Sequence, residues 1–262
     1  MNEDITDPIL EVHDLTVSYS RKPVLWDIDF SLPKGCIAGI IGPNGAGKST
    51  LIKSIMGVIP SSSGYIKVFG QTLDAVRGRV SYVPQRESVD WDFPASVLDV
   101  VLMGRYGKLG LLKNTNKQDK KIALECLEKV GLQDYTKRQI SQLSGGQQQR
   151  VFLARALAQE ADLYLMDEPF AGVDAATEKA IIEILRDMAS NNKTIIVVHH
   201  DLQSVVNYFD WVILINMRLV ASGPTQEVFN NKLIQEAYGG KLTLLTEIGN
   251  ILEKREIPPR EK

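Results

Sequence analysis

Apolar and polar residues alternate near the N-terminus of the chain. The apolar positions are Leu10, Val12, Leu15, Val17, Tyr19, Ile28, Phe30 and Leu32. Alternation with a period of two is typical of a strand with one buried face. We therefore predict half-buried antiparallel strands at the start of the protein.

The centre of the chain has a different pattern, in which short apolar runs alternate with longer stretches of helical period. The apolar runs are 36–41, 163–166 and 194–198, and the helical stretches are 51–56, 117–130, 147–158 and 176–189. Such runs are typical of strands buried on both faces, and strands that alternate with helices form parallel sheets. We predict an α/β protein with a mixed core sheet and an antiparallel N-terminal part.

Weaker patterns predict the remaining elements. We expect strands at 65–69, 80–83 and 211–215, the last followed by a turn at 216–218. Ser96 and Asp99 have the spacing of a capping box for a helix that ends at Met103. We also expect a loop over 104–116, helical structure from Thr225, and a charged, proline-containing end at 253–262.

Composition and charge narrow the class of protein. Of the 262 residues, 24% are charged and 44% are apolar, which is ordinary for a globular protein. The net charge of −2 provides no basic field for nucleic acid. Cys36 and Cys126 match no metal-ligand spacing, so core thiols are expected. The acidic start differs from a signal peptide, and no apolar run reaches the ~18–20 residues of a membrane span. We expect a soluble, cytoplasmic protein.

A glycine-rich loop follows the apolar run 36–41. Its residues fit G-x-x-x-x-G-K-[ST] and are Gly42, Pro43, Asn44, Gly45, Ala46, Gly47, Lys48, Ser49 and Thr50. The strand before it and the helix after it are the context that a phosphate-binding P-loop needs. Backbone N–H groups and the helix N-terminus would bind phosphate, Lys48 would reach the β- and γ-phosphates, and Ser49 would bind Mg²⁺.

A second candidate phosphate cradle precedes the helix predicted at 147–158. Leu143 is followed by Ser144, Gly145, Gly146 and Gln147. Small residues at a helix start expose N–H groups that suit another phosphate. Because the chain has two candidate phosphate cradles but only one lysine-containing loop, two copies of the chain could share bound nucleotides. The alternative is that residues 144–146 form an ordinary serine-glycine helix cap.

Two groups of polar residues end apolar strands. Asp167 and Glu168 follow the run 163–166, where Asp167 could hold Mg²⁺ through water and Glu168 could polarise an attacking water. After the run 194–198, His199, His200 and Asp201 could place an imidazole beside the γ-phosphate. Solvated carboxylates and satisfied strand-end histidines are the alternatives.

With these motifs in order, residues 9–240 resemble the ATP-binding subunits of ABC transporters. The chain is similar to that family at Walker A (42–50), the signature (143–147) and Walker B (163–167). It is also similar at three single residues, where Gln85 matches the Q-loop glutamine, Asp174 the D-loop aspartate and His200 the switch histidine. The resemblance implies a P-loop NTPase fold with a helical subdomain at about 86–160 and a separate tail at 241–262.

The resemblance also implies the site. Glu168 would be the catalytic base, with Lys48 and His200 as further catalytic residues. Ser49, Gln85 and Asp167 would hold Mg²⁺. ATP would contact residues 42–50, Gln85, Asp174, the signature residues 144–147 and Tyr19, the family's adenine-stacking aromatic, which could instead be core.

A finer resemblance covers the segment after the Q-loop. Residues 83–94 and 97–106 and the run 197–202 are similar to ATPases of manganese, zinc and iron importers, with manganese favoured. This implies a homodimer that binds two ATP molecules and drives membrane permease subunits, on the inner face of the membrane, with a substrate-binding protein as indirect partner. Trp91 and Phe93, which follow no helical or strand period, are expected either to bind a short permease helix or to fold into the local core.

Three alternatives remain beside the manganese importer. The transported substrate could be zinc, iron or an iron chelate. Related cassettes act on nucleic acid or the ribosome, but the coiled coil or second cassette that this would require is missing from the sequence. A metal sensor at 199–201 is weak, because adjacent strand residues point to opposite faces.

Overall fold

The computed structural model describes residues 5–20, 22–109 and 114–239. The chain forms two compact units, Met1–Leu73 with Val198–Lys262 and Asp74–Val197, and each is considered by itself. The predicted tail at 241–262 lies outside the described residues. Within the described ranges no helix has the length and apolar character needed to cross a membrane.

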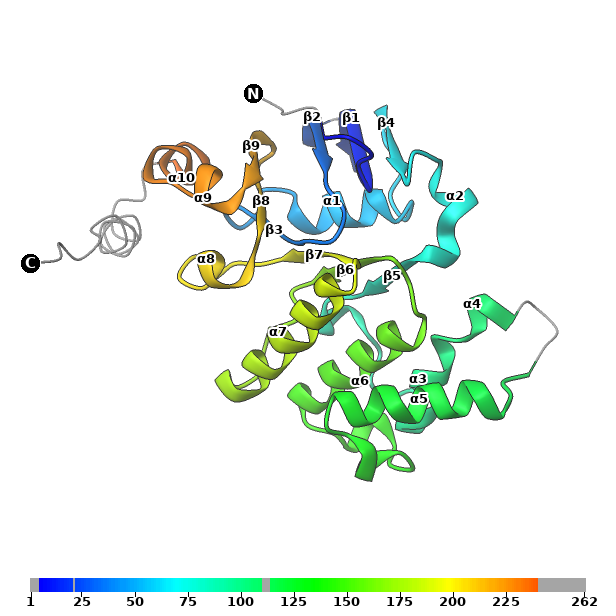
Figure 1. Cartoon of the computed structure of the whole chain (residues 1–262). Helices are drawn as coiled ribbons and strands as arrows, with labels where there is room; N and C mark the ends of the chain where they lie inside the picture. The colour runs from blue at the N-terminus through cyan, green and yellow to red at the C-terminus, as the bar shows by residue number, and fades with distance from the viewer. Residues whose placement is uncertain (1–4, 21, 110–113, 240–262) are drawn as a thin grey trace, which may run out of the picture. The chain divides into compact units, whose positions relative to one another are not determined.

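The first unit contains an antiparallel sheet of three strands in the order β2, β1, β4 (Figure 1). The strands are β1 (Leu10–Ser18), β2 (Pro23–Leu32) and β4 (Ser63–Val68). Leu10 pairs with Leu32 and Val12 with Phe30, and all four side chains are buried. The alternation of apolar residues therefore predicted both the strands and their buried face.

A second set of strands in this unit leads to the glycine loop. β3 (Ile37–Ile41) is wholly buried and pairs in parallel with β8 (Trp211–Asn216). β8 turns at Met217, which has a φ of 59°, and pairs antiparallel with β9 (Arg218–Pro224). The helices of the unit are α1 (Lys48–Ile55), α8 (Val205–Tyr208), α9 (Thr225–Val228) and α10 (Asn231–Tyr238).

The second unit combines parallel strands with the helical part of the chain. Its strands β5 (Val80–Val83), β6 (Leu163–Asp167) and β7 (Thr194–Val198) lie in that order, with Tyr82 beside Leu165. The helices are α2 (Leu73–Val76), α3 (Val97–Met103), α4 (Tyr106–Leu109), α5 (Lys117–Lys129), α6 (Gly145–Ala158) and α7 (Ala175–Ser190). α3, α5 and α6 pack together (Figure 1). The capping box of Ser96 and Asp99 is formed as predicted.

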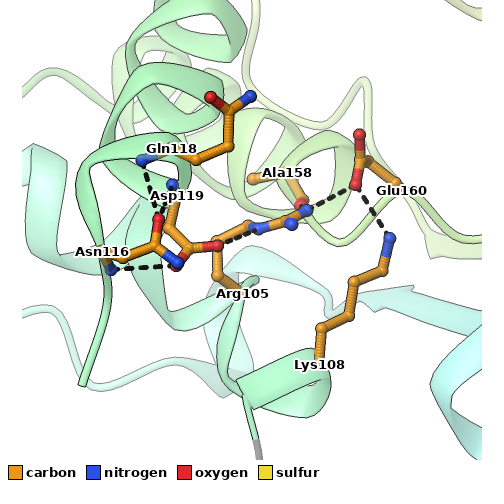
Figure 2. Close-up of polar contacts among 7 residues, drawn as sticks. All are labelled: Arg105, Lys108, Asn116, Gln118, Asp119, Ala158 and Glu160. Carbon is orange, nitrogen blue, oxygen red and sulfur yellow. Dashed lines mark hydrogen bonds and ion pairs between the residues drawn. The ribbon is translucent and has the colours of Figure 1, made fainter. Parts of the chain in front are cut away.

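The prediction of a loop over 104–116 was wrong at α4, and a buried arginine explains how this segment is held. Arg105 is 7% exposed and lies among three segments (Figure 2). Its Nε donates to Asp119 at 3.0 Å, and its Nη1 donates to the Ala158 carbonyl at 2.7 Å and to Glu160 at 2.6 Å. Lys108 on α4 also binds Glu160, at 2.8 Å. Hydrogen bonds from Lys108 and Arg105 hold the pKa of Glu160 below its usual value. The network joins α4, the start of α5 and the end of α6.

Candidate nucleotide site

The glycine loop begins where β3 ends, and its glycines are required by geometry. A Cβ on Gly42 would lie 2.1 Å from the carbonyl oxygen of Ile215 on β8, which leaves no room for a side chain. Gly45 and Gly47 have φ of 83° and 94°, in the left-handed region that glycine adopts at no steric cost. The chain then enters α1 at Lys48.

Lys48 folds back over this loop. Its Nζ donates to the carbonyl oxygens of Gly42 at 2.8 Å and Pro43 at 3.0 Å, and the side chain is 7% exposed. A cation is thus held inside a loop of backbone amides at the N-terminus of an α-helix. This combination of an ammonium group, N–H donors and a helix dipole fits a polyphosphate.

Tyr19 lies just after β1 and is 63% exposed, so the alternative that it belongs to the core is wrong. Its hydroxyl is 3.3 Å from Oγ1 of Thr50, the third residue of α1. The aromatic ring is therefore accessible and is tied to the helix that follows the glycine loop. An exposed ring at this position can stack on a flat ligand.

The two histidines after β7 have different surroundings. His199 is 3% exposed, its backbone N–H donates to Ile40 on β3, and its Nε2 is 2.7 Å from Ser204 Oγ. Burial lowers the pKa of His199 to about 4, although the charge of Asp201 opposes this. His200 is exposed. His199 is a core residue, whereas His200 can meet a ligand.

The histidines do not form a metal site with their neighbours. Across the described ranges, no three or more His, Cys, Asp or Glu side chains are grouped so that they could hold a metal ion.

In the second unit, β6 delivers two carboxylates at its end. Asp167 is the last residue of the strand and is 1% exposed. Glu168 follows with a φ of 53° and is partly exposed. A left-handed conformation is uncommon for a residue other than glycine, and such conformations cluster at functional sites.

Gln85 and Asp174 lie next to two other elements of this unit, after the end of β5 and at the start of α7. Gln85 follows β5 and Pro84, is partly exposed, and accepts a hydrogen bond from Ser88 at 2.7 Å through its carbonyl oxygen. Asp174 is the N-cap of α7 and accepts from the Thr177 N–H at 2.9 Å. This hydrogen bond holds the pKa of Asp174 below its usual value.

The signature segment forms the N-terminus of α6, two residues before the predicted start. Ser144 is exposed and caps the helix in a capping box with Gln147. A Cβ added at Gly146 would lie 3.7 Å from Val173 in the D-loop segment, so the signature and D-loop segments are neighbours. The exposed helix start suits an anion.

Three of the predicted residues carry the oxygen donors that Mg²⁺ prefers: the hydroxyl of Ser49, the amide of Gln85 and the carboxylate of Asp167. This donor set fits the ion chemically. The predicted site residues lie in two groups along the chain, with Tyr19, 42–50 and His200 in the first unit and the others in the second.

Sequence reasoning missed two residues beside the signature. Arg86 follows Gln85 directly, and its guanidinium reaches Gln148 on α6. Gln148 is 4% exposed, although glutamine is usually a surface residue. The only signal in the sequence was a polar residue next to each of two motifs, which is too common to interpret.

Comparison with known proteins gives consistent matches. The family model described as "ABC transporter" matches residues 25–171. A manganese transport system ATP-binding protein of Bacillus subtilis is 59% identical over 91% of this chain and 95% of its own length. A zinc transport system ATP-binding protein of Treponema pallidum is 57% identical over 89% of this chain and 88% of its own length.

Solved structures agree with these relatives. A structure described as an inward-facing, metal-chelate type ABC transporter has a TM-score of 0.78 and 30% identity over 88% of this chain and 89% of its own. The cbiO1 protein of Clostridium perfringens, described as part of an ABC transporter complex, has a TM-score of 0.74 and 29% identity over 95% of this chain and 100% of its own.

Proposed function

This chain belongs to the ABC transporter family, and we propose that it is the ATP-hydrolysing subunit of an importer for a divalent metal ion, with manganese as the first candidate. The observation that carries the proposal is the 59% identity, over nearly the whole length of both chains, to a relative named for manganese transport. Zinc is the second candidate, because a relative named for zinc transport is 57% identical. The family binds ATP, and ATP hydrolysis drives its transport.

We assign the steps of hydrolysis to residues of this chain. Lys48 and the amides of residues 42–47 bind the β- and γ-phosphates, and Tyr19 stacks on the adenine ring. Glu168 accepts a proton from the attacking water, and His200 donates a hydrogen bond to the γ-phosphate. Bound Mg²⁺, held through Ser49, Gln85 and Asp167, would neutralise charge on the phosphates.

The partners follow from the same assignment. A second copy of the chain provides Ser144, Gly145, Gly146 and Gln147 at the opposite face of each ATP, together with Asp174. Two copies bind integral membrane permease subunits on the inner face of the cell membrane, and a substrate-binding protein acts through the permease. The exposed start of α6 supports this arrangement, because it leaves the capping residue Ser144 free to meet another surface.

Ion uptake tests the function and the choice of metal together. Cells that lack the gene are complemented with the wild-type chain or with Lys48→Ala, and uptake of manganese, zinc and iron is measured separately at equal concentrations. We expect the wild type to restore manganese uptake and Lys48→Ala to restore none. Restoration of zinc or iron uptake alone would replace manganese with that metal, and restoration of none of the three would contradict metal import.

A further inference from the structure

One face of α6 contacts the segment that contains the Q-loop glutamine, from Tyr82 on β5 to Trp91. The helix residues Gln148, Phe152 and Arg155 are spaced by four and three positions, so they lie on the same face. Gln148 Oε1 accepts from both Nε and Nη2 of Arg86, at 3.3 and 3.2 Å. Phe152 packs edge-on against Trp91 with ring centroids 5.0 Å apart. Arg155 Nη2 donates to the Tyr82 carbonyl at 3.1 Å.

Arg86 is the centre of these contacts. Its guanidinium lies directly beside Gly145, since a Cβ there would be 2.9 Å from Arg86 Cζ. Its backbone carbonyl accepts from Trp91 Nε1 at 2.9 Å, and its guanidinium also faces the Trp91 ring, 5.9 Å from the centroid. The Arg86 side chain therefore links the backbone next to Gln85 to the first turn of α6, the helix that begins in the signature segment.

Gln148 extends the connection to the segment before the signature. Its Nε2 donates to the Ile140 carbonyl at 3.2 Å while its Oε1 accepts from Arg86. Because Gln148 is 4% exposed, loss of either partner would leave a buried amide group without its hydrogen bond. A planar guanidinium that donates two hydrogen bonds to one oxygen fixes orientation as well as distance.

From this geometry we propose that Arg86 is a positioning residue that fixes the signature end of α6 to the Q-loop segment, so that the two move as one body. The inference deepens the proposed function and rests on it. Arg86 acts through Gly145 and Gln148 rather than on ATP. A displacement of Gln85 by a membrane partner is then passed through Arg86 to Ser144 and Gly146.

The test compares Arg86→Ala, Gln148→Ala and the double variant in ATP hydrolysis by the purified protein. We expect each single variant to lower kcat about tenfold, within the ~10²-fold that a misplaced catalytic group can cost. ATP affinity, measured by nucleotide titration, should stay within about twofold of wild type, because the glycine loop is unaltered. The double variant should be no slower than the slower single variant, as for two residues that act through one contact.

Arg77→Ala is the matched control. Arg77 lies in the same unit but pairs with Asp74 on the surface, at 3.0 Å, so this variant should hydrolyse ATP at the wild-type rate. Wild-type kcat in Arg86→Ala, or losses in kcat that multiply in the double variant, would overturn the inference. If Arg86→Ala does not fold, Arg86→Lys replaces it in the test, because lysine keeps the charge but cannot donate the paired hydrogen bonds. A wild-type kcat in Arg86→Lys would then overturn the inference. Absence of hydrolysis in the wild type would instead overturn the proposed function.

Discussion

Glu168 shows how a single residue can be predicted as a base and then found in an unusual conformation. It follows the buried Asp167, is partly exposed, and has a φ of 53°. We expect Glu168→Gln to lower the ATP hydrolysis rate by about 10²–10⁴-fold, as for loss of a general base. The change leaves Lys48 in place, so ATP binding should persist. Steady-state hydrolysis and nucleotide titration measure the two effects separately.

Glu183→Gln is the control for this substitution, because Glu183 is an exposed glutamate on α7 with no predicted role in the site. It should hydrolyse ATP at the wild-type rate. If Glu168→Gln keeps most of the wild-type rate, another group must accept the proton.

His199 predicts a pH dependence of folding. Its pKa falls from 6.5 to about 4 through burial, so the folded state stays neutral where the unfolded chain takes up a proton. Stability should therefore fall as the pH is lowered from 6.5 towards 4, by on the order of 3 kcal/mol across that window. Urea unfolding at several pH values measures this. His199→Gln should flatten the dependence between these limits, and an equal slope in both proteins would contradict the assignment.

At the residue scale, the sequence predicted those features that depend on neighbours in the chain. The left-handed Gly45 and Gly47 follow from the motif, because the turn itself needs them. The burial of His199 could not be predicted, because it depends on how the following segment folds, which places Ser204 Oγ 2.7 Å from His199 Nε2 and the Phe209 ring 5.3 Å from the imidazole.

At the scale of elements, period and capping predicted strands and helices well. β7 has the predicted bounds, because a threonine followed by four β-branched apolar residues favours a short buried strand. β9 was missed because Arg218–Pro224 has no clear alternation, and it is a strand through its pairing with β8. α4 was missed because its position depends on Arg105 and on residues about 50 positions later in the chain.

The same arginine provides a prediction for the helical part. Arg105→Met should lower the free energy of unfolding by roughly 3 kcal/mol, at the lower end for a broken buried ion pair. The loss is limited because Glu160 still accepts from Lys108, and the Asp119 carboxylate still accepts from the backbone N–H of Asn116, the N-cap of α5. Chemical denaturation measures it. Lys108→Met removes a more exposed partner and should cost at most about 1 kcal/mol. Equal losses in the two variants would contradict a central role for Arg105.

At the scale of the whole molecule, family membership and the order of motifs could be predicted, whereas a docking surface depends on which side chains remain exposed. The two aromatic residues after the Q-loop, Trp91 and Phe93, differ in how far their side chains are exposed. Trp91 is partly buried against Phe152, as in the core alternative. Phe93 is 53% exposed, as expected for a residue that meets a partner. The sequence could not separate them, because neither lies in a regular element with a period.

This division gives the last prediction. If Phe93 contacts the permease, Phe93→Ala should leave ATP hydrolysis by the isolated subunit unchanged, because the ring is 53% exposed and has no predicted role in the nucleotide site. The same variant should bind the permease more weakly, by about tenfold or more if the ring is an anchor of the interface. Trp91→Ala is a poorer test, because it also removes the contact with Phe152. Tyr106→Ala, at a ring that is 56% exposed on α4, is the matched control and should bind normally. Co-purification with the permease and metal uptake in cells measure the effect, and normal binding by Phe93→Ala would place the permease contact elsewhere.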